Sequence, residues 1–252
     1  MKIESSFQRF LDSEGVVYEM LSDCLFRFPE NDIMMEVVPL GKSVVRNDDG
    51  RKYLFEDVWR RNEDVVRARV LAHLGRFTGI FARKCEVSRL DTPQSNDFLS
   101  KYHTYGAARS KYRYGLIAEG KLVCVATFSS GRQMNIDRHV ESYEWVRYAS
   151  LPGVRVVGGM GKLMNAFIDD VHPGEIMSYA DLEWSEGMVY KSLGFVEAGF
   201  RPPVDFYVNT ETWERISLRK LECDRAYRKK ALDNESLVKI SNLGSIKYLK
   251  TI

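Results

Sequence analysis

The first fifty residues alternate short apolar runs with polar breaks, which predicts short elements. The run SFQRFLDSEG spaces its apolar residues as one face of a brief amphipathic helix. CLFRF and DIMMEVVPL are typical of strands, and Pro29, Glu30 and Asn31 separate them. This part of the chain therefore predicts a small helix-and-strand unit.

From Glu56 the apolar period changes to that of a helix. Trp59, Val66, Val70 and Leu74 fall on one face, and Gly75 fits a helix stop. IFARKCEVSRL then predicts a strand. DTPQSND is a polar break, followed by a helix from about Asn96 to Tyr102.

The second half predicts a regular series of elements. YRYGLIAEGKLVCVATFSS is a β-hairpin that turns at Glu119 and Gly120. The elements that follow are a strand (SYEWVRYAS), a helix (GKLMNAFIDDV), a strand (EIMSYADL), a short helix ending at Gly194, a strand or hairpin (DFYVNTETWERISL) and a last pair of short strands around Gly244. The fold class predicted is mixed α/β (α+β).

Composition excludes several classes of protein. Charged residues make up 29% and hydrophobic residues 44% of the 252 residues, as in ordinary globular proteins. No window approaches the ~18 apolar residues of a spanning helix, and the first residues lack the apolar stretch of a signal peptide. The four cysteines and four histidines are scattered singly, so they predict free thiols and no metal site. We expect a folded cytoplasmic protein.

Charge is unevenly distributed, although the formal net charge is only +2. Residues 51–90 hold ten basic and five acidic side chains, whereas residues 141–199 hold four basic and nine acidic ones. Residues 101–113 hold four basic side chains and no acidic one, interleaved with Tyr102, Tyr105 and Tyr112. Cations can hold phosphates and rings can stack on bases, but solvated loops show the same pattern. The segment is a candidate nucleic-acid contact.

The most informative stretch runs from Val154 to Phe200. A strand leads into the turn RVVGGMGK and then into an amphipathic helix. Glycines at such a junction let backbone N–H groups approach an anion that the helix N-terminus also attracts. The candidate cofactor contacts are Val156, Val157, Gly158, Gly159, Gly161 and Lys162. A tight turn without a ligand is an equally good interpretation.

The order strand, glycine turn, helix, strand, then a helix with Y-x-x-x-G-F resembles the second half of the GNAT acyltransferase superfamily. In that superfamily the glycine turn binds the pyrophosphate of coenzyme A, and the tyrosine often protonates the departing thiolate. Tyr190, Gly194 and Phe195 match the last motif, with Val189 at its first position. The turn departs from Q/R-x-x-G-x-G/A at Met160, which a one-residue shift to Gly161 compensates. The resemblance implies a GNAT-like central mixed sheet flanked by helices, with acetyl-CoA or another acyl-CoA as cofactor and no metal.

A wider resemblance covers roughly residues 53–220. The segments FLSKYHTYG, YGLIAEGKLVCVATF, YEWVRYAS, VVGGMGKLMNAFI and SYADLEWSEGMVYKSLGF are similar to a GNAT-like domain of phage proteins that follows a very-short-patch-repair-type nuclease. YLFEDVWRRNEDVVRARVLAHLG is similar to the end of that nuclease. Because Asp32 and Glu36 form no D…E-x-K arrangement, we expect no nuclease activity. The expected division is a small N-terminal α/β extension at residues 1–90 and a GNAT-like domain at residues 91–252.

The same segments resemble phage enzymes that modify adenine in DNA. That resemblance implies catalytic roles for His103 and Tyr190, to which Asp181 is added as a candidate at the end of its strand. Asp181 also fits a polar strand end or a helix N-cap. Glu144 and Arg147 alternate along their strand and are either an ion pair, which we favour slightly, or substrate contacts. The predicted substrate-binding residues are Tyr105, Arg109, Lys111, Arg113, Glu144 and Arg147.

Two functions fit these observations. The first is an acyl-CoA-dependent N-acyltransferase whose acceptor is an amine, for example a nucleobase in DNA or RNA. The second is a non-catalytic module that binds nucleic acid through its basic segments. Affinity for acetyl-CoA separates the two, since a pure binding module has none.

Overall fold

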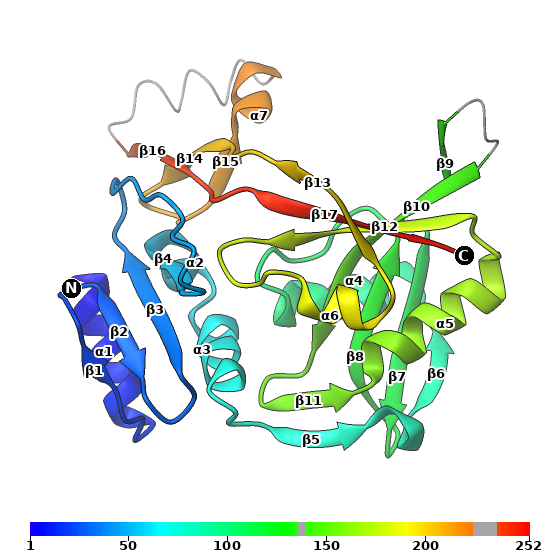
Figure 1. The fold of residues 1–252 in the computed structure, drawn as a ribbon, viewed down its shortest axis with the longest axis horizontal. Coiled ribbons are helices and arrows are strands. Elements are labelled where there is room, and N and C mark those ends of the chain that lie inside the picture. Colours follow the sequence, from blue (N-terminus) through cyan, green and yellow to red (C-terminus); the bar gives the residue numbers. More distant parts are fainter. Residues whose placement is uncertain (136–139, 224–235) are drawn as a thin grey trace. The chain divides into compact units, whose positions relative to one another are not determined.

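The computed structural model describes residues 1–135, 140–223 and 236–252 (Figure 1). The chain forms two compact units. Unit 1 comprises Met1–Arg67, Asp181–Glu186 and Phe200–Ile246, and unit 2 comprises Ala68–Ala180, Gly187–Gly199 and Lys247–Ile252. These units differ from the expected division at residue 90, because residues 68–90 belong to unit 2 and residues 200–246 to unit 1.

Unit 1 contains two sheets. The first has the order β1-β2-β3-β4, from Glu19–Met20, Leu25–Phe28, Ile33–Val38 and Lys52–Phe55. Helix α1 (Ile3–Ser13) precedes it and α2 (Glu56–Arg61) follows it. The second sheet has the order β15-β14-β16, from Arg215–Ser217, Asp205–Asn209 and Leu237–Ser241, with α7 at Leu218–Cys223. The predicted first helix and the two predicted strands after it are confirmed.

Aromatic side chains form the core of unit 1. The buried ring of Phe7 on α1 meets the rings of Phe26 and Trp59 edge-on, with centroids 5.1 and 5.6 Å away. The Trp59 indole N–H donates to Ser6 Oγ at 3.0 Å, so its polar atom is satisfied inside the core. The apolar face predicted for α1 is therefore the face that packs.

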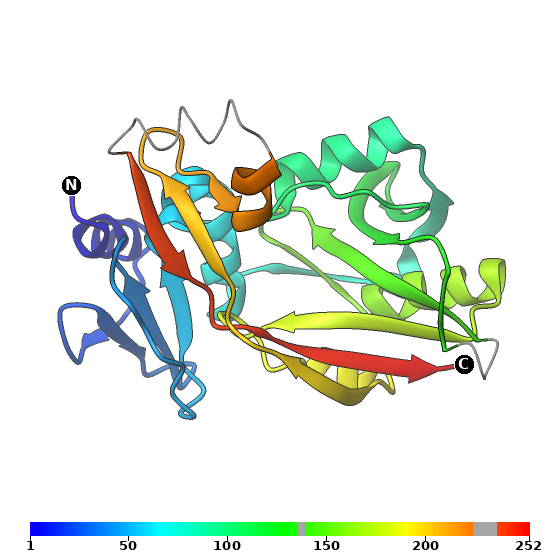
Figure 2. The same cartoon turned by 90° about the horizontal axis from the view of Figure 1, so that it is seen from above.

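Unit 2 is organised around one mixed sheet with the order β13-β17-β12-β10-β8-β7-β6 (Figure 2). Its strands are β6 (Glu86–Arg89), β7 (Tyr112–Ala118), β8 (Lys121–Phe128), β10 (Val140–Ser150), β12 (Glu175–Asp181), β13 (Val196–Arg201) and β17 (Ser245–Thr251). β9 (Arg132–Asn135) pairs with β10, and β11 (Val154–Val157) pairs in parallel with β5 (Thr78–Phe81). The helices are α3 (Glu63–His73), which begins in unit 1, α4 (Thr92–Tyr102), α5 (Gly159–Val171) and α6 (Met188–Ser192), with a 3₁₀ turn at Ala82–Lys84.

Helices α4 and α5 cover opposite faces of this sheet. Val125 of β8 lies in the buried cluster that holds Phe98 and Leu99 of α4. Phe128, three residues further along β8, stacks on Phe167 of α5 with ring centroids 4.0 Å apart. Residues an odd number of positions apart on a strand point to opposite faces. A mixed α/β fold with a central mixed sheet flanked by helices, as predicted, is confirmed.

Local signals explain where helix boundaries differ from the prediction. α4 begins at Thr92 rather than about Asn96, because Asp91 and Gln94 form a reciprocal capping box and Pro93 fits the first turn. The helix predicted from Glu56 is two helices, since Asn62 leaves helical geometry at φ −133° and ψ 47°. The left-handed Gly75 follows α3, as predicted.

Three strand predictions have different outcomes. IFARKCEVSRL forms β5 and β6 in different sheets, separated by the 3₁₀ turn. The hairpin turn at Glu119 and Gly120 is confirmed, and both residues have positive φ, as a two-residue turn requires. The two last strands form, but β16 pairs with β14 whereas β17 pairs in the large sheet. Among the described residues no helix is long and apolar enough to cross a bilayer.

Candidate functional site

Strands β10 and β12 part in the middle of the unit 2 sheet. They pair in parallel from Ser142 opposite Glu175 to Glu144 opposite Met177. Beyond this point β10 stays in register with β8 up to Ser150. A bulge between Trp145 and Arg147 puts Val146 outside that register, and a bulged residue is left unpaired by the ladder. The sheet therefore has a built-in split along the second half of β10.

Tyr190 of α6 reaches this split. Ser178 Oγ lies 2.8 Å from the Tyr190 hydroxyl oxygen and 3.1 Å from the Trp145 carbonyl oxygen. The Trp145 carbonyl and the Val146 N–H belong to one peptide unit, so the phenol lies close to the bulged peptide. Ser178 Oγ is the donor toward both oxygens, and because a serine hydroxyl has one proton, it donates to one of them at a time. Ser178 thus links the Tyr190 phenol to the peptide at the bulge.

Ring contacts fix the orientation of Tyr190. Its ring stacks on Tyr248 at 5.4 Å and meets the rings of Trp145 and Phe195 edge-on at 6.3 and 5.5 Å. Gly194 follows α6 with φ +81°, and the Phe195 N–H donates to the Tyr190 carbonyl at 3.0 Å. The Y-x-x-x-G-F motif is thus the C-terminal end of α6, where the turn at Gly194 brings the ring of Phe195 against the ring of Tyr190.

Burial raises the pKa of the Tyr190 hydroxyl, and its hydrogen bond with Ser178 opposes that rise. The phenol is accordingly protonated throughout the neutral range and is available as a proton donor.

The glycine turn lies beside the same half of β10. Gly158 has φ +77° and precedes α5 as its N-cap. A Cβ on Gly159 would come within 2.8 Å of the Tyr148 hydroxyl of β10, and one on Gly161 within 3.3 Å of Leu193 beside α6. The first N–H groups of a helix have no partner within the helix. These groups, at Gly159, Met160 and Gly161, fit the pyrophosphate of an acyl-CoA.

The other three predicted cofactor contacts, Val156, Val157 and Lys162, differ from one another in exposure and in the groups they contact. Val156 is buried, whereas the side chain of Val157 is 47% exposed beside the turn. Lys162 Nζ donates to the carbonyl oxygens of Ala82 and Cys85, at 3.0 and 2.6 Å. The Lys162 ammonium group therefore holds the 3₁₀ turn in this conformation, and the predicted cofactor contact of Lys162 stays a prediction.

Asp181 serves the turn that follows β12. Its Oδ1 accepts the Glu183 N–H at 3.0 Å, and its carbonyl accepts from Trp184 and Ser185. This arrangement is the polar strand end that the sequence left open as an alternative to catalysis. Asp181 belongs to unit 1 and Tyr190 to unit 2.

His103 directly follows α4 and is a hydrogen-bond donor rather than a base. Its Nδ1 accepts the Tyr105 N–H at 3.0 Å, which places the proton of the neutral ring on Nε2. Burial, together with the charges of Arg147 and Arg69, lowers the pKa of His103 to about 3. A group with this pKa cannot accept a proton near neutrality, so any catalytic role is limited to donating a hydrogen bond.

Glu144 and Arg147 share the sheet face that α4 covers. The bulge moves Arg147 into register with Thr127, and Ser129 exchanges hydrogen bonds with the backbone of Glu144. The Arg147 guanidinium donates to the carbonyl oxygens of Gly106 and Val146, at 3.2 and 3.0 Å. No ion pair joins Glu144 and Arg147 within the part of the chain that the structure describes, so the favoured interpretation of this pair is wrong.

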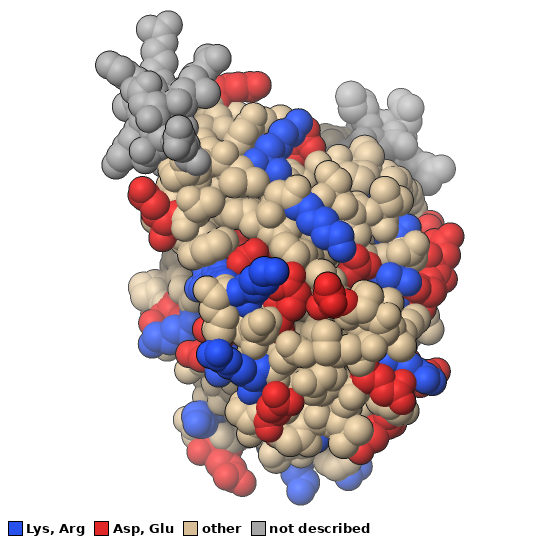
Figure 3. Space-filling model, turned by 90° about the vertical axis from the view of Figure 1, so that its left-hand side faces the viewer, with Lys and Arg blue, Asp and Glu red and all other residues tan. Residues whose placement is uncertain are grey.

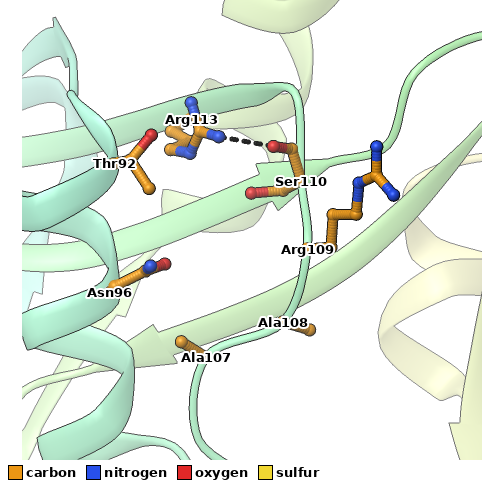
Figure 4. Close-up of a pocket in the computed structure, with 7 residues that line it drawn as sticks. All are labelled: Thr92, Asn96, Ala107, Ala108, Arg109, Ser110 and Arg113. Atoms are coloured by element: carbon orange, nitrogen blue, oxygen red, sulfur yellow. Dashed lines mark hydrogen bonds between the residues drawn. The ribbon is translucent and has the colours of Figure 1, made fainter.

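The predicted basic segment lines two cavities of unit 2. One, of about 380 Å³, is lined by Thr92, Asn96, Ala107, Ala108, Arg109, Ser110 and Arg113 (Figure 4). The other, of about 540 Å³, is lined by Arg109, Ser110, Lys111, Arg113, Ser129, Ser130 and Arg132. The structure thus brings Arg109, Lys111 and Arg113 together, while Tyr105 lies on the adjoining loop and is 41% exposed.

Sequence reasoning missed Ser178, Thr127 and Arg132. Ser178 and Thr127 interrupt buried apolar strands, and a small polar residue in such a run is a weak signal of an internal hydrogen bond. Arg132 lies outside the segment that was singled out for its charge, and only the pairing of β9 with β10 places it near that segment.

A scan against protein-family models finds no match to this sequence, and no curated protein matches it. Among solved structures, the ribosomal-protein-S18-alanine N-acetyltransferase from Escherichia coli is similar at a TM-score of 0.42 and 16% identity, over 67% of this chain and 94% of that one. A Bacillus subtilis acetyltransferase in complex with CoA has a TM-score of 0.38 at 13% identity, over 67% and 99% of the chains. An IAA acetyltransferase from Bacillus cereus has a TM-score of 0.39 at 11% identity, over 67% and 99%. With TM-scores below 0.5, these similarities do not assign an activity to this chain.

Proposed function

We propose that this chain is an acyl-CoA-dependent N-acyltransferase of the GNAT type. The observation that carries the proposal is the position of Tyr190, whose hydroxyl is held by Ser178 where β10 and β12 part. The glycine turn at the start of α5 adjoins the same strand through Tyr148. The ordered motifs that resemble the superfamily therefore form one site in unit 2.

The chemistry needs little from side chains. The acyl-CoA supplies an activated thioester. The first N–H groups of α5 bind its pyrophosphate, and the split beside β10 accommodates its arm. The N–H of Val146, at the bulge where β10 leaves its register with β8, is the group we assign to polarise the thioester carbonyl. The acceptor amine attacks that carbonyl, and Tyr190 donates its proton to the departing sulfur. The attacking nitrogen loses a proton as the amide forms, and this proton restores the phenol of Tyr190.

Replacing Tyr190 by Phe tests this role. The variant keeps the ring that stacks on Tyr248 and removes only the hydroxyl. We expect unchanged acetyl-CoA affinity and about a hundredfold slower thiol release, which is the usual scale for losing one general acid. Thiol release from acetyl-CoA would be measured with a single-stranded oligonucleotide containing all four bases as acceptor.

Tyr114→Phe is the matched control, since it removes a phenol that is hydrogen-bonded to Asp170 of α5. This control should release thiol as fast as the original protein. A Tyr190→Phe variant with the original rate would exclude Tyr190 as the acid.

We further propose that the acceptor is a nucleobase in DNA or RNA, approached through His103, Tyr105, Arg109, Lys111 and Arg113. Support comes from the basic walls of the two cavities and from the exposed Tyr105 ring beside them. On the face shown in Figure 3, basic and acidic side chains are interspersed. With a net charge of +2, we expect local and weak contact with few phosphates.

A further inference from the structure

The two cavities of unit 2 adjoin each other. They share Arg109, Ser110 and Arg113. In Figure 4, Thr92 and Asn96 of α4 face the segment 107–110, and Arg109 extends away from them. The larger cavity adds Lys111, Arg132 and two serines. Among the residues that the structure describes, no acidic side chain lines either cavity.

Arg113 is held in place by the backbone next to it. Its guanidinium donates to the carbonyl oxygen of Ser110 (Figure 4) and also to that of Lys111. Its Nε is buried and has no hydrogen-bond partner among the described residues. A fixed arginine with a remaining donor is suited to bind oxygen anions.

The sheet beside Arg113 carries polar side chains on the α4 face. Thr127 of β8 is directly opposite Arg113 on β7 and opposite Arg147 on β10, so the three side chains form a row on the α4 face. Thr127 is fully buried, and within the described part of the chain its hydroxyl has no partner. This row of two half-buried arginines and a buried threonine places a second positive charge near Arg113, where partial burial reduces screening by solvent.

Two basic residues of unit 2 are paired with carboxylates. Arg89 pairs with Asp170, and Lys101 pairs with Asp97. Among the described residues, no carboxylate forms an ion pair with Arg109, Lys111 or Arg113. Clustered cations without counter-charges repel each other and are stabilised by a bound anion.

We propose that the two cavities form one site that binds a phosphate ester, with Arg113 as its fixed contact and Arg109, Lys111 and Arg132 around it. Four cations and the hydroxyl groups of Ser110 and Ser130 suit a tetrahedral group with several anionic oxygens better than a planar carboxylate. The volume of about 540 Å³ leaves room for the group that carries the phosphate.

This inference deepens the proposed function and rests on it in one respect, namely that the phosphate ester belongs to the acceptor. The site itself depends only on the walls of the cavities.

The test measures binding of three probes: inorganic phosphate, adenosine 5′-monophosphate and a fluorescent single-stranded oligonucleotide. We expect the oligonucleotide to bind at about 50 mM salt and to be displaced by the monophosphate. Arg113→Gln should weaken oligonucleotide binding about tenfold and reduce the slope of log affinity against log salt by about one.

Lys101→Ala is the matched control, because it removes an exposed cation of α4 that already has a partner. It should bind the probes as the original protein does. Arg132→Ala should also weaken binding. Because Arg132 is exposed, this variant tests the site even if Arg113→Gln does not fold.

Three results would decide the proposal. No binding of any probe at this salt concentration, or equal losses for Arg113→Gln and Lys101→Ala, would overturn the phosphate site. Binding of the monophosphate without the oligonucleotide would support the site and contradict a nucleic-acid acceptor. Acetyl-CoA titrated in parallel keeps the two proposals distinguishable, since a protein that binds phosphate esters but not acetyl-CoA has the site without the proposed activity.

Discussion

At the residue scale, burial gives Tyr190 and His103 complementary roles. It keeps the Tyr190 phenol protonated and keeps the His103 ring neutral, so each is a donor near neutral pH. The sequence resemblance singled out both residues. The roles of Ser178 and Thr127 could not be predicted, because a single polar residue in an apolar strand has no spacing that identifies its partner.

A buried charge cluster in unit 1 predicts a pH dependence at the residue scale. Arg215 donates to Asp57 at 2.5 Å and to Glu183 at 3.2 Å, so one cation serves two buried carboxylates. Burial, opposed by Arg215, raises the pKa of Glu183 above its ordinary value of 4.5. The folded chain therefore binds this proton more tightly than the unfolded chain. Its contribution to stability is complete below that ordinary value and is lost as pH rises through the raised pKa.

Replacing Glu183 by Gln removes this titration. We expect the variant to gain stability relative to the original protein as pH rises from about 5 to about 8, measured by urea unfolding. Glu197→Gln, at an exposed residue of β13, is the control and should show no such trend. A stability difference between Glu183→Gln and the original protein that does not change with pH would contradict this prediction.

At the element scale, boundaries were predictable where a local rule applies. The hairpin turn at Glu119 and Gly120 and the stop at Gly75 depend on residues that accept positive φ. The N-terminus of α4 was predicted four residues too late, because Asp91, Pro93 and Gln94 look like a polar break until they are identified as a cap.

The cap of α4 provides the prediction at this scale. Asp91→Ala removes the acceptor for the Gln94 N–H, which lies 2.7 Å away. We expect a loss of about 1 kcal/mol in the free energy of unfolding, measured with urea. Asp97→Ala, which removes an exposed pair with Lys101, should cost about 0.3–0.5 kcal/mol. Equal losses for the two variants would show that the cap contributes no more than a surface pair.

At the scale of the whole molecule, the sequence predicted the elements from β7 to α6, apart from β9, but not the grouping of the chain. Residues 200–246 contribute a sheet to the unit that holds the N-terminus, while the last strand belongs to the large sheet of unit 2. Such pairings join segments that are far apart in the sequence, and apolar periodicity describes only neighbouring residues. The candidate site was accessible to sequence reasoning because its motifs lie between Val154 and Phe200.

The central claim is that the glycine turn and the split beside β10 bind an acyl-CoA, and calorimetric titration with acetyl-CoA tests it most directly. Gly159→Val is unsuitable as the test variant, since its Cβ would lie 2.8 Å from the Tyr148 hydroxyl and 3.0 Å from the Cβ of Val156. Gly161→Val is better, because its Cβ meets only the side chain of Leu193, at 3.3 Å, and its bulk would obstruct the first N–H groups of α5.

Asn165→Val, one turn further along α5 at an exposed position, is the matched control. The original protein and Asn165→Val should bind acetyl-CoA with equal affinity, whereas Gly161→Val should bind at least about tenfold more weakly while it unfolds at a similar temperature. Absence of any acetyl-CoA binding to the original protein, or undiminished binding to Gly161→Val, would contradict the account.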